Sequence, residues 1–501
     1  MSRPQGIGPG DRFRVRIDAS KCDGQGVCGL VAPELFSFDR YGYAYLVDGV
    51  QDVLDADDSA RRSAIEAEAT CPRLAIVLEK LGPAPAAAGG APVAPAATRP
   101  PVPADWSDDR RRLHVGDAVE TLDDWKAAGG FGPVERERLW ADAEAFGLRG
   151  QGGALFPVVS KWRQLDGARD AVVLVNAAER EPGTMKDRYL LAHRPFLFLD
   201  GVRLAALAVG ATKAVVAVDE DHADIADGVR TALAAAGPVM DGVAVDVTLV
   251  PAKYVAGEET ALIASVQGGP PLPKWRPPYP STAGLNGKPT LVHNAETVCQ
   301  IGLIGARGAA MEATTLFTVG PFGGPFDVVE RPFGYSLAAL LSECGYGTAG
   351  SAGAIGAVIV GGYSGGVVAP DRLEVAMWND PLKSVGASLG TKSVQVVPAE
   401  RCPVEVVASI LEFFGGETAR QCPPCERGLP DMAAIVRRLE RGEAQTGDMD
   451  DLSTFMGTLA GRGICRLPDG AARVALALLA NFEDHVASHL AGACPLVAVG
   501  P

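Results

Sequence analysis

Short apolar runs alternate with longer, mainly apolar segments through the middle of the chain. Three of the runs are typical of buried strands: AVVLVNA at 171–177, AVVAVDE at 214–220 and VTLVPA at 247–252. The segments HRPFLFLDGVRLAALAVGA and HADIADGVRTALAAAG lie between them and are long enough to be helices. This alternation predicts a Rossmann-like α/β domain with a largely parallel sheet over residues 107–310.

The pattern changes on both sides of this domain. Residues 311–395 hold short strand-like runs (LFTVG, DVVE, AVIVGG) separated by Gly and Pro, with one helix near 336–344, which predicts a small β-rich module. Residues 396–490 predict a helical domain, and 491–501 a tail. Residues 1–85 form a compact acidic unit, and the Ala- and Pro-rich stretch 86–106 predicts a semi-rigid linker.

Composition narrows the class of protein. The 501 residues carry a formal net charge of -15, which argues against a nucleic-acid partner. The most apolar stretch, 195–218, contains Asp200, Arg203 and Lys213, so it is interpreted as a buried helix plus strand. The first residues lack the apolar core of a signal peptide. We therefore expect a soluble, cytoplasmic protein without direct membrane insertion, in which any membrane link goes through a partner.

Ten cysteines are present, and six fall into two groups with ligand-like spacing. The first group, Cys22, Cys28 and Cys71, has the pattern Cys-x5-Cys, a long gap, then Cys-Pro. Thiolates are soft ligands suited to iron–sulfur clusters. Gln25 stands where a fourth cysteine would be needed, so the spacing favours a [3Fe-4S] cluster or a [4Fe-4S] cluster with a labile corner. Zinc fits this spacing less well, and three unrelated buried cysteines are the remaining alternative.

Residues 12–82 resemble a single-cluster bacterial ferredoxin of the type that serves cytochromes P450. The resemblance includes APELFSFDRYGYA between the ligands and the ending CPRLAI. It implies a ferredoxin-like α+β fold for this part of the chain.

Four polar segments interrupt the apolar middle of the chain: GLRGQGGALFPVVSKW (147–162), NAAEREPGTMKDR (176–188), KYVAGEETALIASVQG (253–268) and KPTLVHNAETV (288–298). Glycines let backbone N–H groups approach a phosphate, and Arg149 and Lys161 add positive charge. Amides, carboxylates and hydroxyls are the groups that bind a ribityl chain and ribose hydroxyls. The alternative interpretation is a set of helix caps and turns.

These four segments, in this order, resemble the FMN- and NADH-binding flavoprotein subunit of respiratory complex I and the diaphorase subunits of NAD-linked hydrogenases and formate dehydrogenases. The resemblance covers about residues 110–490. It implies an FMN site formed by Arg149, Gly150, Gly152, Gly153, Lys161, Asn176, Glu179, Tyr254, Gly257, Glu258, Glu259, His293, Asn294 and Thr297. It implies a border of the NADH site formed by Phe156, Lys161, Glu181, Tyr254, Glu259 and Tyr279, with Glu181 and Lys161 as the catalytic residues.

Three positions depart from the family pattern. The chain has Ala178 where the family usually has Asp, His293 in place of Asn, and Leu155 in place of Gly. Each hydrogen bond contributes only about 0.5–1.5 kcal/mol net, so a missing carboxylate should weaken flavin binding without abolishing it. We expect Leu155 to narrow the nucleotide face. A carboxylate at Glu181 favours NADH over a 2′-phosphorylated nucleotide.

The resemblance also implies a soluble ligand-binding β-grasp module in the β-rich part and a [4Fe-4S] cluster in the C-terminal helical bundle. Cys422, Cys425 and Cys465 keep the ligand spacing, but Ala419 replaces a further cysteine of the relatives. The cluster is then altered, completed by another ligand, or lost, with a structural Cys-x2-Cys pair as the alternative. Elsewhere, Cys299 and Cys402 are interpreted as core residues, and His485 and His489 as surface or core histidines. Cys494-Pro495 resembles the start of a further ferredoxin domain in some relatives.

The combined hypothesis is an NADH dehydrogenase or diaphorase subunit. It oxidises NADH by hydride transfer to FMN and passes single electrons to the clusters and to a redox partner in a complex that could be membrane-bound. One alternative is a non-catalytic relay that keeps the flavin and the clusters but has lost NADH oxidation, which Ala178 and Ala419 favour. Another is a nucleotide-gated scaffold with empty cluster sites.

Overall fold

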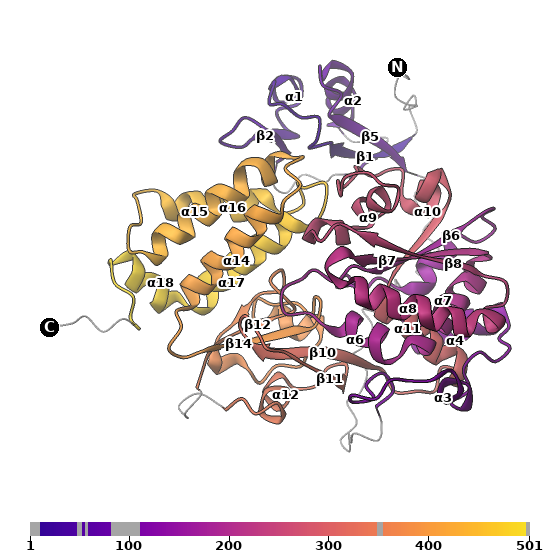
Figure 1. The fold of residues 1–501 in the computed structure, drawn as a ribbon. Helices are drawn as coiled ribbons and strands as arrows, with labels where there is room; N and C mark the ends of the chain where they lie inside the picture. Colours follow the sequence, from indigo (N-terminus) through magenta and orange to yellow (C-terminus); the bar gives the residue numbers. More distant parts are fainter. Residues whose placement is uncertain (1–10, 48–52, 56–58, 82–110, 348–353, 497–501) are drawn as a thin grey trace.

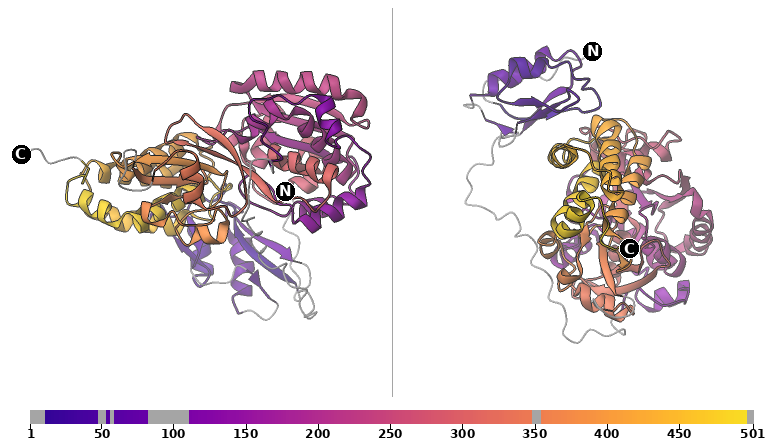
Figure 2. Two further views of the ribbon diagram at one scale, coloured as in Figure 1. Left: turned by 90° about the horizontal axis from the view of Figure 1, so that it is seen from below. Right: turned by 90° about the vertical axis from the view of Figure 1, so that its left-hand side faces the viewer.

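The computed structural model describes residues 11–47, 53–55, 59–81, 111–347 and 354–496. The sequence-predicted linker at 86–106 lies outside these ranges, as does the end of the predicted tail. Figures 1 and 2 show a small N-terminal unit against one end of a larger body. That body contains two sheets and a bundle of helices.

The N-terminal unit is an antiparallel sheet covered by two helices. β1 is the central strand because it pairs with both β4 and β5. Phe13 and Val15 alternate with polar residues along β1 and are buried beneath the helices. The elements are β1 (Arg12–Ile17), α1 (Val27–Val31), β2 (Phe36–Phe38), β3 (Ala44–Leu46), β4 (Val53–Leu54), α2 (Arg61–Thr70) and β5 (Ile76–Leu81).

A four-stranded parallel sheet of order β8-β7-β6-β9 confirms the alternation seen in the sequence. Strands β6, β7 and β9 are buried on both faces because helices cover both: α4, α5, α7, α8 and α11 on one face and α9 on the other. The edge strand β8 is largely exposed or half-buried. The strands are β6 (Val172–Ala177), β7 (Lys213–Asp219), β8 (Ala244–Val250) and β9 (Thr290–Asn294). The helices are α3 (Leu122–Ala127), α4 (Arg136–Phe146), α5 (Val158–Arg163), α6 (Lys186–His193), α7 (Pro195–Val209), α8 (Ala223–Ala236), α9 (Glu259–Val266), α10 (Pro280–Ala283) and α11 (Ala295–Arg307).

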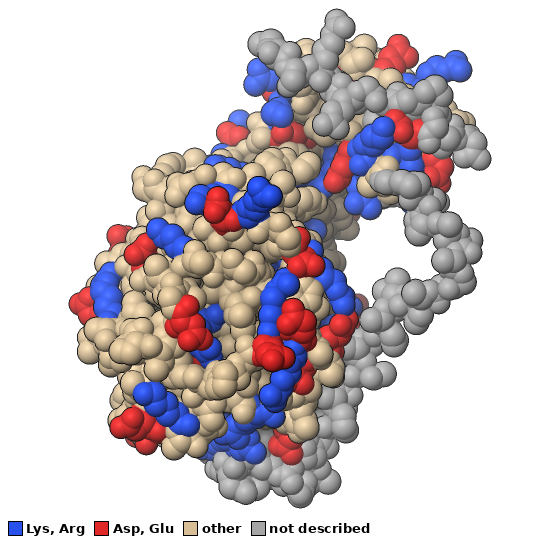
Figure 3. Space-filling model, turned by 90° about the vertical axis from the view of Figure 1, so that its right-hand side faces the viewer, with Lys and Arg blue, Asp and Glu red and all other residues tan. Residues whose placement is uncertain are grey.

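The apolar stretch 195–218 forms α7 followed by β7, as expected, and nearly every residue of α7 is buried. No helix within the described parts of the chain is long and apolar enough to cross a membrane. On the face drawn in Figure 3, Lys and Arg side chains are interspersed with Asp and Glu side chains.

A second, mixed sheet has the order β11-β10-β14-β12-β13, in which β10 and β14 are parallel and the other pairs antiparallel. The helix predicted near 336–344 is α12, and the hydroxyl of Ser336 caps its start by accepting from the N–H of Ala339. The elements are β10 (Thr314–Pro321), β11 (Asp327–Pro332), α12 (Leu337–Glu343), β12 (Ile355–Val360), β13 (Val367–Val368), α13 (Asn379–Lys383) and β14 (Ser393–Pro398).

A bundle of helices completes the body, in agreement with the sequence. The helices share one apolar core, to which the cysteines at 422, 425 and 465 belong. They are α14 (Pro403–Glu417), α15 (Leu429–Glu440), α16 (Asp448–Leu459), α17 (Leu467–Asn481) and α18 (Glu483–Leu490). The N-terminal unit lies beside α15 and α16 at one end of this bundle (Figure 1).

Candidate functional site

The glycine-rich loop between α4 and α5 folds back on itself. Arg149 and Pro157 form an isolated antiparallel bridge, and the guanidinium of Arg149 donates to the carbonyl of Leu155 at 3.1 Å. Gly150 donates its N–H to the carbonyl of Phe156 at 2.9 Å. A Cβ at Gly152 would lie 3.3 Å from that of Asn294, and Gly153 has a φ of +107°. The loop therefore requires glycine for close approach to β9 and for its backbone turn.

A buried ionic network anchors this loop from the second sheet. The ammonium of Lys392 donates to the side-chain and backbone oxygens of Gln151, at 2.7 and 3.2 Å, and to the carboxylate of Glu296 at 2.7 Å. Lys186 lies 3.3 Å from the same carboxylate and 2.7 Å from Asp187. Burial lowers the pKa of Lys392 to about 8. The pKa of Glu296 is lowered because the two cations outweigh the effect of burial.

Sequence reasoning did not identify Lys392, Glu296, Lys186 or Asp187 as site residues. It selected the neighbouring Asn294 and Thr297 instead. The structure places both of these on the same network. The amide of Asn294 bonds Asp187 at 2.5 Å, and the hydroxyl of Thr297 accepts from the N–H of Gln151 at 2.8 Å.

The polar residues at the end of β6 meet the segment before α9. The amide of Asn176 donates to the carbonyl of Gly257 at 2.8 Å. Gly257 passes close to Ala178, since a Cβ there would lie 3.6 Å from the Ala178 carbonyl oxygen. Glu258 caps α9 by accepting from the N–H groups of Thr260 and Ala261. The sequence-predicted segments around 176 and 257 are therefore brought together.

Lys161 and Glu259 form an ion pair beside β9. The ammonium of Lys161 also donates to the carbonyl of Val292 at 3.1 Å. Both side chains keep about a third of their surface exposed. Arg276 lies 3.6 Å from the same Glu259 carboxylate. This pair is thus held at the sheet edge while remaining accessible to a ligand.

Glu181 stands where the two sheets and the helical bundle meet. Its carboxylate accepts from the hydroxyl of Tyr254 at 2.9 Å and from the N–H of Ser364 at 3.2 Å. Burial raises the pKa of Glu181 to about 7 despite these hydrogen bonds. A Cβ at Gly362 would lie only 2.6 Å from the carboxylate, so glycine is required there. Glu181 can therefore exchange a proton near neutral pH.

Three of the expected site residues make contacts that support the fold. The carboxylate of Glu179 accepts from the N–H groups of Asp187 and Arg188 at the start of α6, and burial raises its pKa to about 7. His293 accepts from the indole N–H of Trp162 at 3.1 Å. Burial, reinforced by the charge of Lys161, lowers the pKa of His293 to about 3, so this imidazole is neutral. Thr297 holds the glycine loop, as described above.

The aromatic residues expected at the nucleotide are open to solvent, with Phe156 and Tyr279 both more than 40% exposed. Leu155 is buried in the core of the second sheet, with a φ of +48°. It packs there against Phe317 and Val319 and is only 6% exposed.

The C-terminal cysteines converge in the bundle core. Cys422, Cys425 and Cys465 are each less than a tenth exposed. The hydrogen bond with Cys425 lowers the pKa of Cys422 to about 7, whereas burial raises that of Cys465 to about 11. The hydroxyl of Thr418 bonds Cys425, and Ala419 follows it in the chain. Three soft donors that interact with one another fit an iron–sulfur cluster with one non-cysteine corner.

The N-terminal cysteines line one pocket. Cys22, Cys28 and Cys71 surround it, together with the loop Gly24–Gln25–Gly26, in which both glycines have positive φ. The N–H of Ala75 donates to the sulfur of Cys71 at 3.3 Å. The side chain of Gln25 bonds Asp23 at 3.3 Å. Sulfur donors around a loop of exposed amides are the environment that a cluster requires.

The N-terminal unit contacts the bundle beside the C-terminal cysteines. Arg462 donates to the carboxylate of Asp39 at 2.9 Å, and Arg40 pairs with Asp451 at 2.5 Å. The ring of Tyr41 stacks on Phe455 with centroids 6.3 Å apart. A cleft of about 580 Å³ between the two parts is lined by Cys22 on one side and by Pro423 and Pro424 on the other. Cys22 therefore lies on one wall of this cleft, and the prolines between Cys422 and Cys425 lie on the other.

Aromatic side chains connect Glu181 with the bundle. The ring of Tyr254, which bonds Glu181, makes edge contacts with Phe413 and Phe414 of α14 at 5.5 and 5.9 Å between centroids. The same tyrosine packs against the apolar core that contains Cys422, Cys425 and Cys465. Described contacts thus run from the sheet edge to the C-terminal cysteines and on to the N-terminal unit.

Comparison with known proteins agrees with this arrangement. Residues 143–303 match the Nuo51 FMN-binding domain, 405–489 the NADH-ubiquinone oxidoreductase-F iron–sulfur binding region, and 15–78 a 4Fe-4S single cluster domain. The second F subunit of the NADH-quinone oxidoreductase of Rhizobium meliloti is 32% identical over 390 residues, covering 73% of this chain and 91% of that protein. The chain belongs to the family of NADH-quinone oxidoreductase F subunits.

A second relative and a solved structure are also similar to this chain. The protein from Mycobacterium tuberculosis strain H37Rv is 32% identical over 375 residues, covering 70% of this chain and 84% of that protein. A solved structure of an NAD+-reducing [NiFe]-hydrogenase in the H2-reduced state has a TM-score of 0.67 and 24% identity, and covers 95% of this chain and 85% of that chain. The similarity to the hydrogenase structure shows that the two chains share a fold.

Proposed function

We propose that this member of the family oxidises NADH with FMN and delivers electrons singly to two iron–sulfur clusters. The observation that carries the proposal is the convergence of the four polar segments at one sheet edge, with a chain of contacts to both cysteine groups. The N-terminal cluster is a [3Fe-4S] or labile [4Fe-4S] cluster. The C-terminal one is a [4Fe-4S] or altered cluster.

The residues at the sheet edge fit FMN. Gly152 and Gly153 let the loop backbone pass close to Asn294 and Gly390. Arg149 and Lys161 supply positive charge for a phosphate. Asn176, Glu258, Glu259 and Asn294 offer amide and carboxylate groups for the ribityl hydroxyls. Bound there, FMN would supply hydride acceptance and one-electron release. The buried network around Lys392 holds the glycine-rich loop in a fixed position relative to the proposed FMN site.

NADH would approach over the exposed rings of Phe156 and Tyr279, which offer flat apolar surfaces for a nicotinamide or an adenine. The ammonium of Lys161 positions negatively charged groups of the ligands. Glu181 orients the nucleotide. Because the pKa of Glu181 is about 7, its carboxyl group can carry a proton near neutral pH. The Tyr254 hydroxyl fixes the orientation of that carboxylate.

The finer domain assignments are part of the proposal. The N-terminal unit is the ferredoxin (1–85) and is joined by the linker 86–106 to the Rossmann-like FMN and NADH domain (107–310). The module at 311–395 is a β-grasp module, which its mixed strand order and the parallel pairing of β10 with β14 support. Residues 396–490 form the iron–sulfur bundle and 491–501 a tail. The downstream acceptor is a partner protein in a cytoplasmic electron-transfer complex.

Rapid mixing of the anaerobic protein with NADH tests the proposal. Flavin absorbance should bleach in the wild type, and Lys161→Met should slow the bleaching by at least about tenfold, since it removes the positive charge at the sheet edge. Lys383→Ala is the matched control, because Lys383 is 70% exposed and pairs with Asp380 on α13. Equal bleaching rates in all three proteins would refute the role of Lys161.

A further inference from the structure

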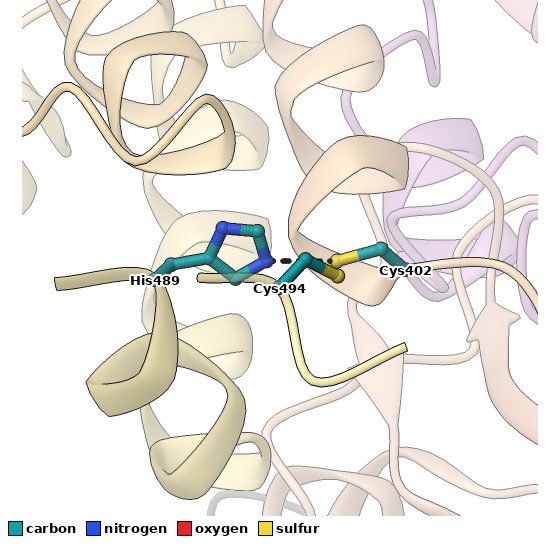
Figure 4. A group of neighbouring side chains, drawn as sticks. All are labelled: Cys402, His489 and Cys494. Atoms are coloured by element: carbon teal, nitrogen blue, oxygen red, sulfur yellow. Dashed lines mark hydrogen bonds between the residues drawn. The ribbon is translucent and has the colours of Figure 1, made fainter. Parts of the chain in front are cut away.

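Three donor side chains converge at the end of the bundle away from the N-terminal unit. Cys402, His489 and Cys494 bring one ligand atom each to within 4.8 Å of one another, and the sulfur of Cys402 lies 3.2 Å from Nε2 of His489 (Figure 4). Of the described residues, only this trio is so closely placed. Cys402 is far in sequence from His489 and Cys494, which lie five residues apart, so the sequence does not reveal that the three meet.

The local fold directs each donor toward the same point. Cys402 is the N-cap residue of α14, and its sulfur lies within 4.8 Å of that of Cys494. His489 occupies the last turn of α18 and is 1% exposed. After α18 the chain reverses at Gly492, whose φ is +89°, and this reversal returns Cys494 to the histidine.

Close packing supports the reversal. The N–H groups of Gly492 and Ala493 donate to the carbonyls of His489 and Ser488, at 3.0 and 3.1 Å. A Cβ at Gly442 would lie 3.0 Å from the carbonyl oxygen of Gly492, so glycine lets the end of α15 touch this turn. The position of Cys494 is therefore determined by helix ends that belong to the core of the bundle.

We propose that Cys402, His489 and Cys494 bind a structural Zn²⁺ ion. Two thiolates and an imidazole are a common zinc donor set. Around a tetrahedral zinc, sulfur at about 2.3 Å and nitrogen at about 2.0–2.1 Å are separated from one another by about 3.3–3.8 Å, which small side-chain shifts achieve here. This site is independent of the proposed redox function.

The fourth ligand is a water molecule or His485. His485 lies one turn before His489 on α18, and its Nε2 is buried without a hydrogen-bond partner among the described residues. The Nδ1 atom of His489 is buried in the same way. The zinc links the segment after α18 to the start of α14, at the end of the bundle away from the N-terminal unit. Such a link stabilises the folded state because it closes a long loop.

Zinc analysis of the full-length protein, purified anaerobically, tests the site. We expect about one zinc per chain in the wild type and its loss in Cys402→Ser and His489→Gln. Cys344→Ser is the matched control, since Cys344 is a half-buried cysteine outside the trio, and it should keep the zinc. Iron and flavin contents should be the same in all four proteins, which would show that the variants fold.

X-ray absorption at the zinc edge of the wild type gives a second, variant-free readout. The proposal predicts two sulfur ligands with one or two nitrogen ligands. Zinc with three sulfur ligands would instead be bound by one of the two groups of three cysteines. The zinc content would then be unchanged in His489→Gln. The proposal would be overturned by a Cys402–Cys494 disulfide, by copper or iron bound at Cys402, His489 and Cys494, or by the absence of zinc from the wild type.

Discussion

Replacing Lys392 by Met removes the cation that links the second sheet to the glycine loop. The substitution keeps the length and apolar stem of the side chain but loses the contacts to Glu296 and Gln151 at 2.7 Å each. Removing one partner of a buried ion pair costs about 3–5 kcal/mol. Lys186 still lies 3.3 Å from the Glu296 carboxylate, so we expect the lower end, about 3 kcal/mol.

This loss corresponds to about a hundredfold change in the folding equilibrium constant. It should appear in urea unfolding followed by the fluorescence of Trp125 and Trp162, which are fully buried in the domain of the parallel sheet. The variants should be compared at matched flavin content. Amide hydrogen exchange should rise at residues 149–153, because Gln151 has lost its anchor.

Two further variants make the test specific. The double variant Lys392→Met with Glu296→Gln no longer buries an unpaired carboxylate, so it should recover about 1–2 kcal/mol relative to the sum of the single effects. Lys383→Ala breaks an exposed pair in the same region and should cost less than about 0.5 kcal/mol. A loss below about 1 kcal/mol for Lys392→Met, or strict additivity in the double variant, would refute the reasoning.

Three other predictions concern pH, docking and the N-terminal cluster. Because burial raises the pKa of Glu181 to about 7, its contribution to stability is full below its ordinary pKa and is lost as the pH rises through 7. Glu181→Gln should therefore gain about 1–3 kcal/mol over the wild type in urea unfolding near pH 8 but almost nothing near pH 5; equal differences would contradict this. Arg462→Ala should slow reduction of the N-terminal cluster in freeze-quench EPR, since Arg462 and Asp39 are largely buried at the interface; Arg466→Ala, at an 80% exposed position, should not, and equal rates in both variants would count against docking. Cys71→Ser should lower the iron content by about three to four atoms per chain and leave NADH-dependent flavin bleaching intact, whereas an unchanged iron content would exclude a cluster at that cysteine.

Much of the fold follows from local patterns. The strand-like runs at 171–177 and 214–220 correspond to β6 and β7, because consecutive apolar residues suit strands that are covered on both faces. The run at 247–252 overlaps β8, but this edge strand is largely exposed or half-buried instead of buried. The helix expected near 336–344 is present as α12, and the hydroxyl of Ser336 caps its start. Burial of Cys299 in α11 also agrees with its apolar surroundings in the sequence.

Long-range polar contacts could not be predicted in this way. Lys392 and Gln151 are far apart in sequence, and Lys392 belongs to the β-rich module whereas Gln151 belongs to the glycine-rich loop. The contact of Arg462 with Asp39 and the convergence of Cys402 on His489 likewise depend on packing between segments. At such positions the sequence shows only a charged residue or a cysteine, and no local pattern identifies its partner.

An anaerobic titration with NADH, followed by absorbance and low-temperature EPR, tests the central claim most directly. The account predicts that NADH bleaches the flavin and produces signals from reduced clusters in both the N-terminal unit and the bundle. If NADH leaves both unchanged while dithionite reduces them, the chain is an electron relay without NADH oxidation, and the proposed function is contradicted.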